Sequence, residues 1–220
     1  MRCAILTANK LRHIFFANKL AKINPEALLY ENKINSFSEE LVFKDHLEFD
    51  DKLKTIKTDD LNSQESFDIL NALELDFIFI FGCRLLSKKI ISCAKKDVIN
   101  IHTGLTQYHR GVDSPHWAFV ENRPDLIGYT IHSVTPGIDD GKVYFQGHFN
   151  DFNKDDNIDT IFLKNCKQAI SDLSEQVDDI LNGRMRPKEY NIGKLYQMKD
   201  MSESPKKILA KNLKAFLQKI

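Results

Sequence analysis

The segment VINIHTGLTQYHRG, from Val98 to Gly111, places Asn100 and His102 two residues apart at the end of an apolar run. Because side chains alternate along a β-strand, both residues lie on one face of the strand predicted for VINIH. An asparagine amide can donate a hydrogen bond to a carbonyl oxygen that gains charge during attack, and a neighbouring imidazole can donate to it or transfer a proton. The alternative is a strand end whose polar side chains are satisfied by loop backbone.

Two adjacent carboxylates, Asp139 and Asp140, follow a strand-like run of alternating apolar residues in the segment TPGIDDGK. One of these carboxylates can orient His102 and relay a proton through water. An aspartate-rich turn without chemistry is the alternative, because aspartate side chains readily bond their own backbone. Either segment alone is weak evidence for a catalytic site.

The elements that must position these residues form an alternating pattern. Near-continuous apolar runs predict buried strands, and amphipathic segments between them predict helices, which together indicate an α/β fold with a mostly parallel sheet covered on both faces. An antiparallel pair is predicted for IGYTIHSVT and GKVYFQGHF around the turn PGIDDG. A strand with an irregular or helical excursion is expected over 31–63. The other expected strands cover 1–8, 77–81 and 98–102, and helices fall within 9–24, 66–76, 85–97, 114–124, 157–183 and 204–220.

The composition argues against nucleic-acid-binding, membrane-bound and secreted classes of protein. Lysine plus arginine and aspartate plus glutamate each number 31, so we expect neither nucleic acid nor an anionic membrane as a partner. Charged residues from Lys10 onward argue against a signal peptide, and the run FIFIFGCRLL is too short to cross a bilayer. The four cysteines form no CxxC pair, and three of them lie in apolar surroundings, where we expect a buried thiol rather than a disulfide or a metal ligand. We therefore expect a cytoplasmic protein.

Histidine spacing does not predict a metal site. His102, His109 and His116, with Asp113, are evenly spaced, but this spacing gives no ligand geometry across a loop and a helix start. The remaining histidines are expected to be ordinary surface or strand residues, although His13 lies where a substrate could reach; they are His13, His46, His132 and His148.

These motifs carry a family resemblance over residues 75–147. The chain resembles the formyltransferases that use 10-formyltetrahydrofolate, which include glycinamide ribonucleotide transformylase, methionyl-tRNA formyltransferase and the sugar N-formyltransferases. Their signature is an Asn-x-His strand end, a segment like SLLPxYRG, and a later Asp in a loop of the type (V/L/I)-D-(A/T)-G. Here NIHTGLTQYHRG and GIDDG supply these elements, with Gln107 in place of the usual proline.

The resemblance implies a Rossmann-like formyltransferase domain over residues 1–183 and a short helical extension over 184–220. It also implies roles: Asn100 binds the formyl oxygen, His102 stabilises the oxyanion or accepts the amine proton, and Asp139 holds His102 and a proton-carrying water. Asp140 fills the variable position of the motif. The donor 10-formyltetrahydrofolate, with no metal, is expected to bind through its pterin to Cys83, Arg84, Leu85, Leu86, Ile138 and Asp139.

Departures from the family pattern reduce the number of classes of amine that the protein is expected to formylate. The loop LTANKLRHIFF contains no glycine, so it lacks the backbone phosphate cradle of the purine-pathway enzyme. The residues after Gly183 are too few for the barrel with which methionyl-tRNA formyltransferase grips tRNA. We therefore expect a stand-alone sugar N-formyltransferase that acts on a nucleotide-linked amino sugar for polysaccharide synthesis. Its expected substrate-binding residues are Lys10, Arg12, His13 and Arg110.

Two alternatives to an amino-sugar acceptor remain open. The chain could be the phosphoribosylglycinamide formyltransferase of purine synthesis, or a folate-binding relative that has lost catalysis. The apolar residues of the extension fit either a homodimer contact or docking on the same domain; they are Ile208, Leu209, Leu213, Phe216 and Leu217.

Overall fold

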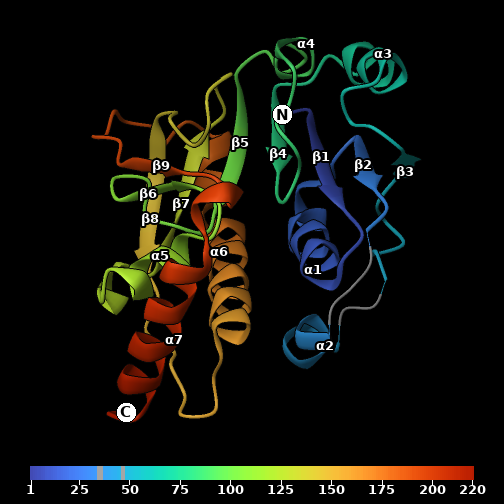
Figure 1. Ribbon diagram of the computed structural model, residues 1–220. Helices are drawn as coiled ribbons and strands as arrows, with labels where there is room; N and C mark the ends of the chain where they lie inside the picture. Colours follow the sequence, from blue (N-terminus) through green and yellow to red (C-terminus); the bar gives the residue numbers. More distant parts are fainter. Residues whose placement is uncertain (34–36, 46–47) are drawn as a thin grey trace.

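A seven-stranded sheet, in the order β3-β2-β1-β4-β5-β7-β8, forms the centre of the structure, as Figure 1 shows. The computed structural model describes residues 1–33, 37–45 and 48–220. In this order, the strands β3, β2, β1, β4 and β5 pair in parallel. Strands β7 and β8 continue the sheet in antiparallel pairing. This confirms the predicted α/β class. The strands are β1 (Cys3–Ala8), β2 (Ala27–Glu31), β3 (Thr55–Thr58), β4 (Phe77–Ile80), β5 (Asp97–His102), β7 (Gly128–Ser133) and β8 (Val143–His148).

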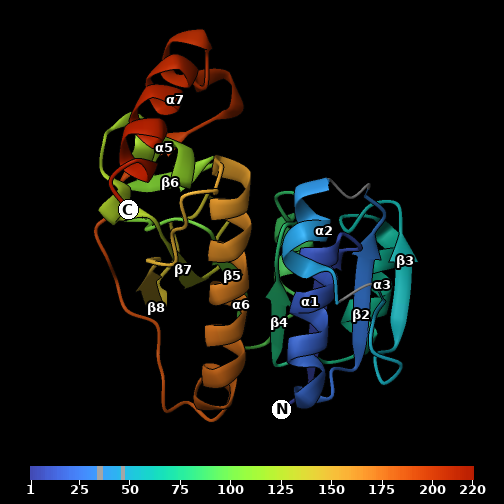
Figure 2. The ribbon, with the colours of Figure 1, turned by 90° about the horizontal axis from the view of Figure 1, so that it is seen from below.

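Helices cover both faces of this sheet. Figure 2 shows α1 and α6 along one face, and α3 and α4 pack against the other. The helices are α1 (Leu11–Leu20), α2 (Phe37–Phe43), α3 (Gln64–Ala72), α4 (Lys88–Ile91), α5 (Ser114–Val120), α6 (Ile158–Leu181) and α7 (Glu203–Leu217), with 3-10 turns at Ala21–Ile23, Pro124–Leu126 and Met198–Asp200. Among the described residues, no helix is long and apolar enough to span a membrane.

The strands are apolar on both faces because each face meets helices. In β1, Cys3 and Ile5 join the core against α1 and α6, whereas Ala4 and Leu6 join the core against α3 and α4. A fully buried parallel strand therefore reads as a continuous apolar run rather than an alternating one. On β5 the pattern breaks at the carboxyl end of the strand, which is where open α/β sheets bind their ligands.

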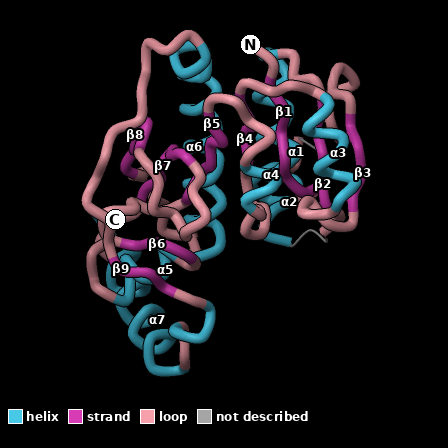
Figure 3. The backbone as a smooth tube through the Cα atoms, turned by 90° about the horizontal axis from the view of Figure 1, so that it is seen from above, coloured by secondary structure: helices cyan, strands magenta, loops and turns pink. Residues whose placement is uncertain are grey.

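A second, two-stranded sheet lies outside this frame. Strand β6 (His109–Gly111) pairs in parallel with β9 (Lys194–Tyr196), and Figure 3 shows both beside α5 and α7. The predicted last helix is α7, which packs on α5 with the rings of Phe119 and Phe216 5.6 Å apart. The predicted helix 157–183 is α6, which ends at Leu181, and Gly183 follows with a left-handed φ of 70°.

Three short strands, β2, β6 and β9, were not among the expected elements. Neither β6 nor β9 was predicted, because a strand of three residues is too short to show a period of two. Over 31–63 the expected strand and helical excursion correspond to β3 and α2, whereas β2, at Ala27–Glu31, was not expected. Within this region, residues 34–36 and 46–47 lie outside the described residues.

The start of α6 offers a test of the fold. The Asn157 side chain accepts from the Thr160 N–H at 2.9 Å, and the Thr160 hydroxyl accepts from the Asn157 N–H at 2.9 Å. Because this reciprocal cap satisfies two donors, Asn157→Ala should lower the free energy of unfolding by about 1 kcal/mol in urea titrations. Asn153→Ala, whose exposed side chain caps no helix, is the control. Equal stability of the two variants would contradict this assignment of the cap.

Candidate active site

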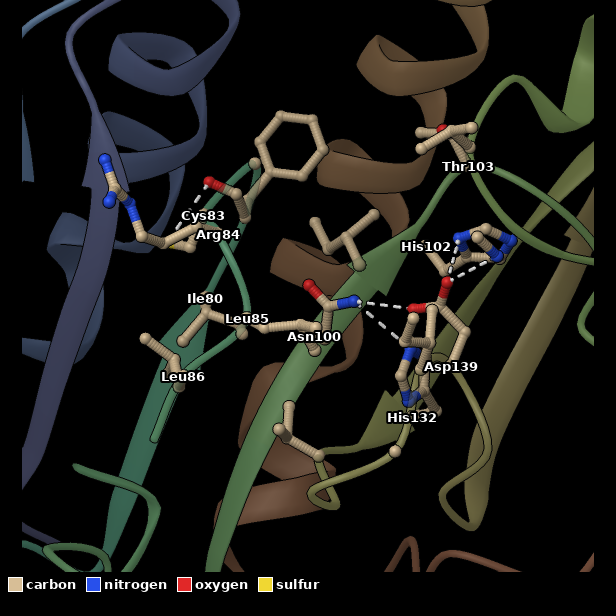
Figure 4. Close-up of a pocket in the computed structure, with 18 of the residues that line it drawn as sticks. Ile80, Cys83, Arg84, Leu85, Leu86, Asn100, His102, Thr103, His132 and Asp139 are labelled. Atoms are coloured by element: carbon tan, nitrogen blue, oxygen red, sulfur yellow. Dashed lines mark hydrogen bonds and ion pairs between the residues drawn. The ribbon is translucent and has the colours of Figure 1, made fainter. Parts of the chain in front are cut away.

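Four polar side chains meet at the carboxyl end of β5. Asn100 lies opposite His132 in the antiparallel register of β5 and β7, and His102 lies opposite Thr130. Asp139 comes from the turn after β7 and has a left-handed φ of 46°. In Figure 4, Asn100, His102 and His132 surround the Asp139 carboxylate. Two segments distant in sequence thus form one cluster.

The Asp139 carboxylate is the centre of this cluster. Its Oδ2 lies 3.2 Å from Nδ1 of His102 and accepts the Gly111 N–H at 2.9 Å. Its Oδ1 lies 3.3 Å from Nε2 of His132 and accepts from Nδ2 of Asn100 at 3.5 Å. The neighbouring Asp140 instead bonds to the Thr135 hydroxyl, so Asp139 is the carboxylate against His102.

The protonation pattern of His102 follows from its partners. Nε2 lies 2.9 Å from the main-chain oxygen of His109, and a carbonyl can only accept, so Nε2 carries a proton. The other nitrogen, Nδ1, faces Asp139. A proton on Nδ1 would therefore be shared with the carboxylate, and the His102–Asp139 pair can take up and return one proton.

Asn100 and His132 also form an ordered pair. Nδ1 of His132 donates to the Ser133 carbonyl at 2.8 Å, and Nε2 of the same ring lies 3.2 Å from Nδ2 of Asn100. An amide N–H of Asn100 points to Asp139 at the longest distance in the cluster, 3.5 Å. That N–H is the donor most easily transferred to a bound oxygen.

Burial and neighbouring charges set the ionisation of the cluster. Burial alone would raise the pKa of Asp139, but His102, His132 and the Gly111 N–H outweigh it and hold the pKa well below its usual range. Burial lowers the pKa of His102, and the charge of Asp139 opposes part of this shift. At neutral pH the site therefore holds a carboxylate next to a neutral imidazole that can accept a proton.

A cavity of about 550 Å³ opens beside the cluster. Figure 4 shows Cys83 to Leu86 on one side of it and the histidines with Asp139 on the other, with Asn100 between them. All six residues expected to contact the pterin line this cavity: Cys83, Arg84, Leu85, Leu86, Ile138 and Asp139. Ile80 and Val134 add apolar side chains to the lining of the cavity.

The loop of Cys83 to Leu86 is anchored from behind. Nζ of Lys33 donates to the Gly82 carbonyl at 3.0 Å, and Arg84 pairs with the buried Glu31 at 3.2 Å. Gly82 has a left-handed φ of 65°, and a Cβ there would lie 2.2 Å from Nε2 of His13. A glycine at position 82 therefore lets the His13 ring pack directly behind the cavity wall.

The residues expected to bind substrate fall in different places. Of the four, Arg12 alone lines the cavity, and both Arg12 and Lys10 pair with the buried Glu39. His13 is fully buried behind Gly82 rather than open to the cavity, contrary to expectation, because it lies on the core side of α1. Arg110 donates to the Gly193 and Ile138 carbonyls at 2.9 and 3.1 Å and is not among the lining residues.

Some residues of the site were not identified from the sequence. His132 was read as an ordinary surface or strand residue, yet it is 3% exposed within the cluster. The alternation of Thr130 and His132 in an apolar strand is the same signal that identified Asn100 and His102. The cavity also takes residues from α6 and from the extension, which have no such signal: Phe162, Tyr196, Gln197 and Met198.

The low pKa of Asp139 generates a pH prediction. Because the pKa is lower in the folded than in the unfolded chain, its stabilisation is complete above the unfolded value of about 3.9 and is lost as the pH falls toward the folded value. Asp139→Asn should therefore lower the free energy of unfolding by about 2 kcal/mol at pH 7 and by less at pH 3. Urea titrations at both pH values measure this, and a deficit independent of pH would contradict it.

Parts of two curated proteins are similar to this chain in sequence. The chain is similar to the bifunctional polymyxin resistance protein ArnA of Wigglesworthia glossinidia brevipalpis, with 27% identity over 135 residues, 61% of this chain and 20% of that protein. The methionyl-tRNA formyltransferase of Bacillus licheniformis is 28% identical over 139 residues, 62% of this chain and 43% of that protein. The chain thus spans less than half the length of these curated relatives.

Solved structures share the fold over most of their length. A sugar N-formyltransferase from Shewanella sp FDAARGOS_354 has a TM-score of 0.68 at 18% identity, covering 97% of this chain and 88% of that one. PseJ of Anoxybacillus kamchatkensis, solved with UDP-4,6-dideoxy-4-formamido-L-AltNAc and tetrahydrofolate, has 0.62 at 21%, covering 90% and 87%. Glycinamide ribonucleotide transformylase 1 of Symbiobacterium toebii has 0.63 at 15%, covering 88% and 95%.

Most of the chain matches one known protein family. The pattern that describes the formyl transferase family matches residues 18–172, which is more than half of the chain. The matched range contains Asn100, His102 and Asp139, the residues on which the resemblance was based. The chain belongs to the formyl transferase family.

Proposed function

We propose that the protein transfers a formyl group from 10-formyltetrahydrofolate to a primary amine of a small molecule, a nucleotide-linked amino sugar. The observation that carries this proposal is the convergence of Asn100, His102 and Asp139 beside one cavity. Formyl transfer needs a donor to an oxyanion and a group that moves a proton, and this cluster offers both.

The chemistry assigns each side chain one task. The amine nitrogen attacks the formyl carbon, a C–N bond forms, and the carbonyl electron pair moves onto oxygen. An N–H of Asn100 leaves its 3.5 Å contact with Asp139 and donates to that oxyanion. The proton lost by the amine reaches the His102–Asp139 pair, which returns it through water to N10 of folate as the old C–N10 bond breaks.

The donor side of the cavity suits a flat heterocycle. Two contacts hold the loop from Cys83 to Leu86: Lys33 donates to the carbonyl of the preceding Gly82, and Arg84 pairs with Glu31. The backbone groups of the loop are therefore held in place before a ligand arrives. Ile80, Leu86 and Val134 add apolar lining to the cavity. PseJ, which shares the fold, was solved with tetrahydrofolate. These features support pterin binding along residues 83–86 with Ile138 closing the other side.

The acceptor side favours a substrate larger than a simple amine. Arg12, Phe162 and Met198 line the cavity and offer one cation and two apolar contacts. The turn after β1 lacks glycine, so a phosphate there would meet Lys10 and Arg12 side chains rather than a backbone cradle. The Lys10 and Arg12 charges face the Glu39 carboxylate in this structure, and a nucleotide diphosphate would compete for them.

Further parts of the proposal rest on the same reaction. We infer that it runs in the cytoplasm, needs no metal and supplies a formylated sugar for polysaccharide synthesis. Among the described residues, no group of three or more histidine, cysteine, aspartate or glutamate side chains could hold a metal ion. We also propose a domain boundary at residue 183. For the apolar residues of the extension, a homodimer contact and docking on the same domain remain the two alternatives, and Leu209, Leu213 and Phe216 pack with Phe119 of the same chain in this structure.

Variants at the cluster separate catalysis from binding. Asn100→Ala and His102→Ala should each lower formyl transfer by about 10²- to 10³-fold, because the oxyanion loses a donor or the amine proton loses its acceptor. Tetrahydrofolate affinity, measured by calorimetry, should barely change. Asn71→Ala and His148→Ala, at exposed positions that do not line the cavity, are matched controls. Equal loss of turnover and folate affinity would favour a binding protein without catalysis.

An acceptor panel decides which amine is used. The protein is incubated with 10-formyltetrahydrofolate and, separately, with nucleotide-linked amino sugars and with glycinamide ribonucleotide. We expect a formylated product, detected by mass spectrometry, with at least one amino sugar. Turnover of glycinamide ribonucleotide alone would assign the protein to purine synthesis instead, an alternative kept because the Symbiobacterium enzyme shares the fold equally well.

A further inference from the structure

Strand β6 touches both members of the His102–Asp139 pair. Its first residue, His109, accepts from Nε2 of His102 through its main-chain carbonyl at 2.9 Å. Its last residue, Gly111, donates its N–H to Oδ2 of Asp139 at 2.9 Å. The position of three consecutive backbone units therefore sets the orientation of the imidazole and of the carboxylate together.

The position of β6 depends on the C-terminal extension. Within the described part of the chain, β6 has β9 as its strand partner and is not joined to the main sheet. The Val112 N–H donates to the Tyr196 carbonyl at 3.1 Å, and Nε of Arg110 donates to the Gly193 carbonyl at 2.9 Å. The extension thus supplies the hydrogen bonds that a central strand would receive from its sheet.

Tyr196 adds a side-chain link to the same strand. Its ring is buried and stacks on Trp117, with centroids 4.0 Å apart and planes at 17°. Its hydroxyl donates to Oε1 of Glu121 at 2.7 Å, and Oε2 of Glu121 lies 3.0 Å from Nε2 of His109. One carboxylate therefore joins the extension to the residue whose carbonyl holds His102.

We propose that Tyr196 is a positioning residue for formyl transfer, which acts through Glu121 and His109 to hold His102 against Asp139. The kinetic part of this inference rests on the proposed function. The hydroxyl of Tyr196 does not need to touch either substrate for this role. It fixes the His109 side chain, and thereby the carbonyl that keeps the proton of His102 on Nε2 and leaves Nδ1 facing Asp139.

The test removes one oxygen atom. Tyr196→Phe keeps the stack on Trp117 and the cavity wall but deletes the donor to Glu121. We expect kcat to fall about three- to tenfold, the effect of one hydrogen bond, with KM for both substrates within about twofold. Glu121→Gln should show a similar loss, and the double variant should lose less than the product of the two, because both act through one link.

Tyr144→Phe is the matched control. The Tyr144 hydroxyl also donates to a carboxylate at 2.7 Å, that of Asp97, at the opposite end of β5 from His102. This variant should lose comparable stability but keep kcat. Equal kcat in the Tyr196 variant, the Tyr144 variant and the parent protein would overturn the proposal. A rise of KM in step with the fall of kcat would overturn it too, because it would indicate damage to the cavity wall.

A measurement without substrate separates this inference from the proposed function. Nitrogen NMR of labelled histidine reports which ring nitrogen of His102 carries the proton and at what pH the ring titrates. The groups near this ring are Asp139, His132 and His109. Because the His109 carbonyl favours the protonated ring, Tyr196→Phe should lower the titration midpoint of His102 and mix its tautomers. Unchanged His102 signals would overturn the inference even if no acceptor amine were ever found.

Discussion

The carboxylate of Asp139 is the point at which the separate parts of the site are joined. It contacts histidines from β5 and β7, the amide of Asn100 and the backbone of β6. A buried carboxylate is stable only when surrounding donors replace the water that it loses. The need to satisfy this one charge therefore draws the turn after β7, the end of β5 and the short strand β6 to a common centre.

The scaffold makes that centre possible by being rigid elsewhere. Strands β1, β2 and β4 are buried on both faces, and the apolar clusters on the two sides of the sheet fix their register. Polar side chains are tolerated where β5 leaves this core and meets the antiparallel strand β7. Asn100 and His132 become direct neighbours there because the register of the two strands pairs them. The reacting groups thus lie at the edge of a firmly packed core, which holds β5 and β7 in register.

The features that could be predicted from the sequence are those that a local pattern of residues encodes. Apolar runs revealed β1, β4 and β5, and the spacing of Asn100 and His102 indicated the polar end of β5. Other features depend on pairing between distant segments. Strand β6 has three residues and owes its conformation to β9, which lies beyond α6. The buried site of His13 and the place of His132 in the cluster likewise follow from tertiary packing, and neither residue type reveals its burial by itself.

The contact between Gly82 and His13 limits the order in which these two residues can be substituted during evolution. Any side chain at position 82 would need the space that the imidazole at position 13 fills, and the backbone there would be strained as well. His13 must therefore be replaced by a smaller residue before Gly82 can be replaced by a residue with a side chain. Among descendants of this sequence, the two positions should mutate in a fixed order, and a library that randomises 82 alone should return glycine.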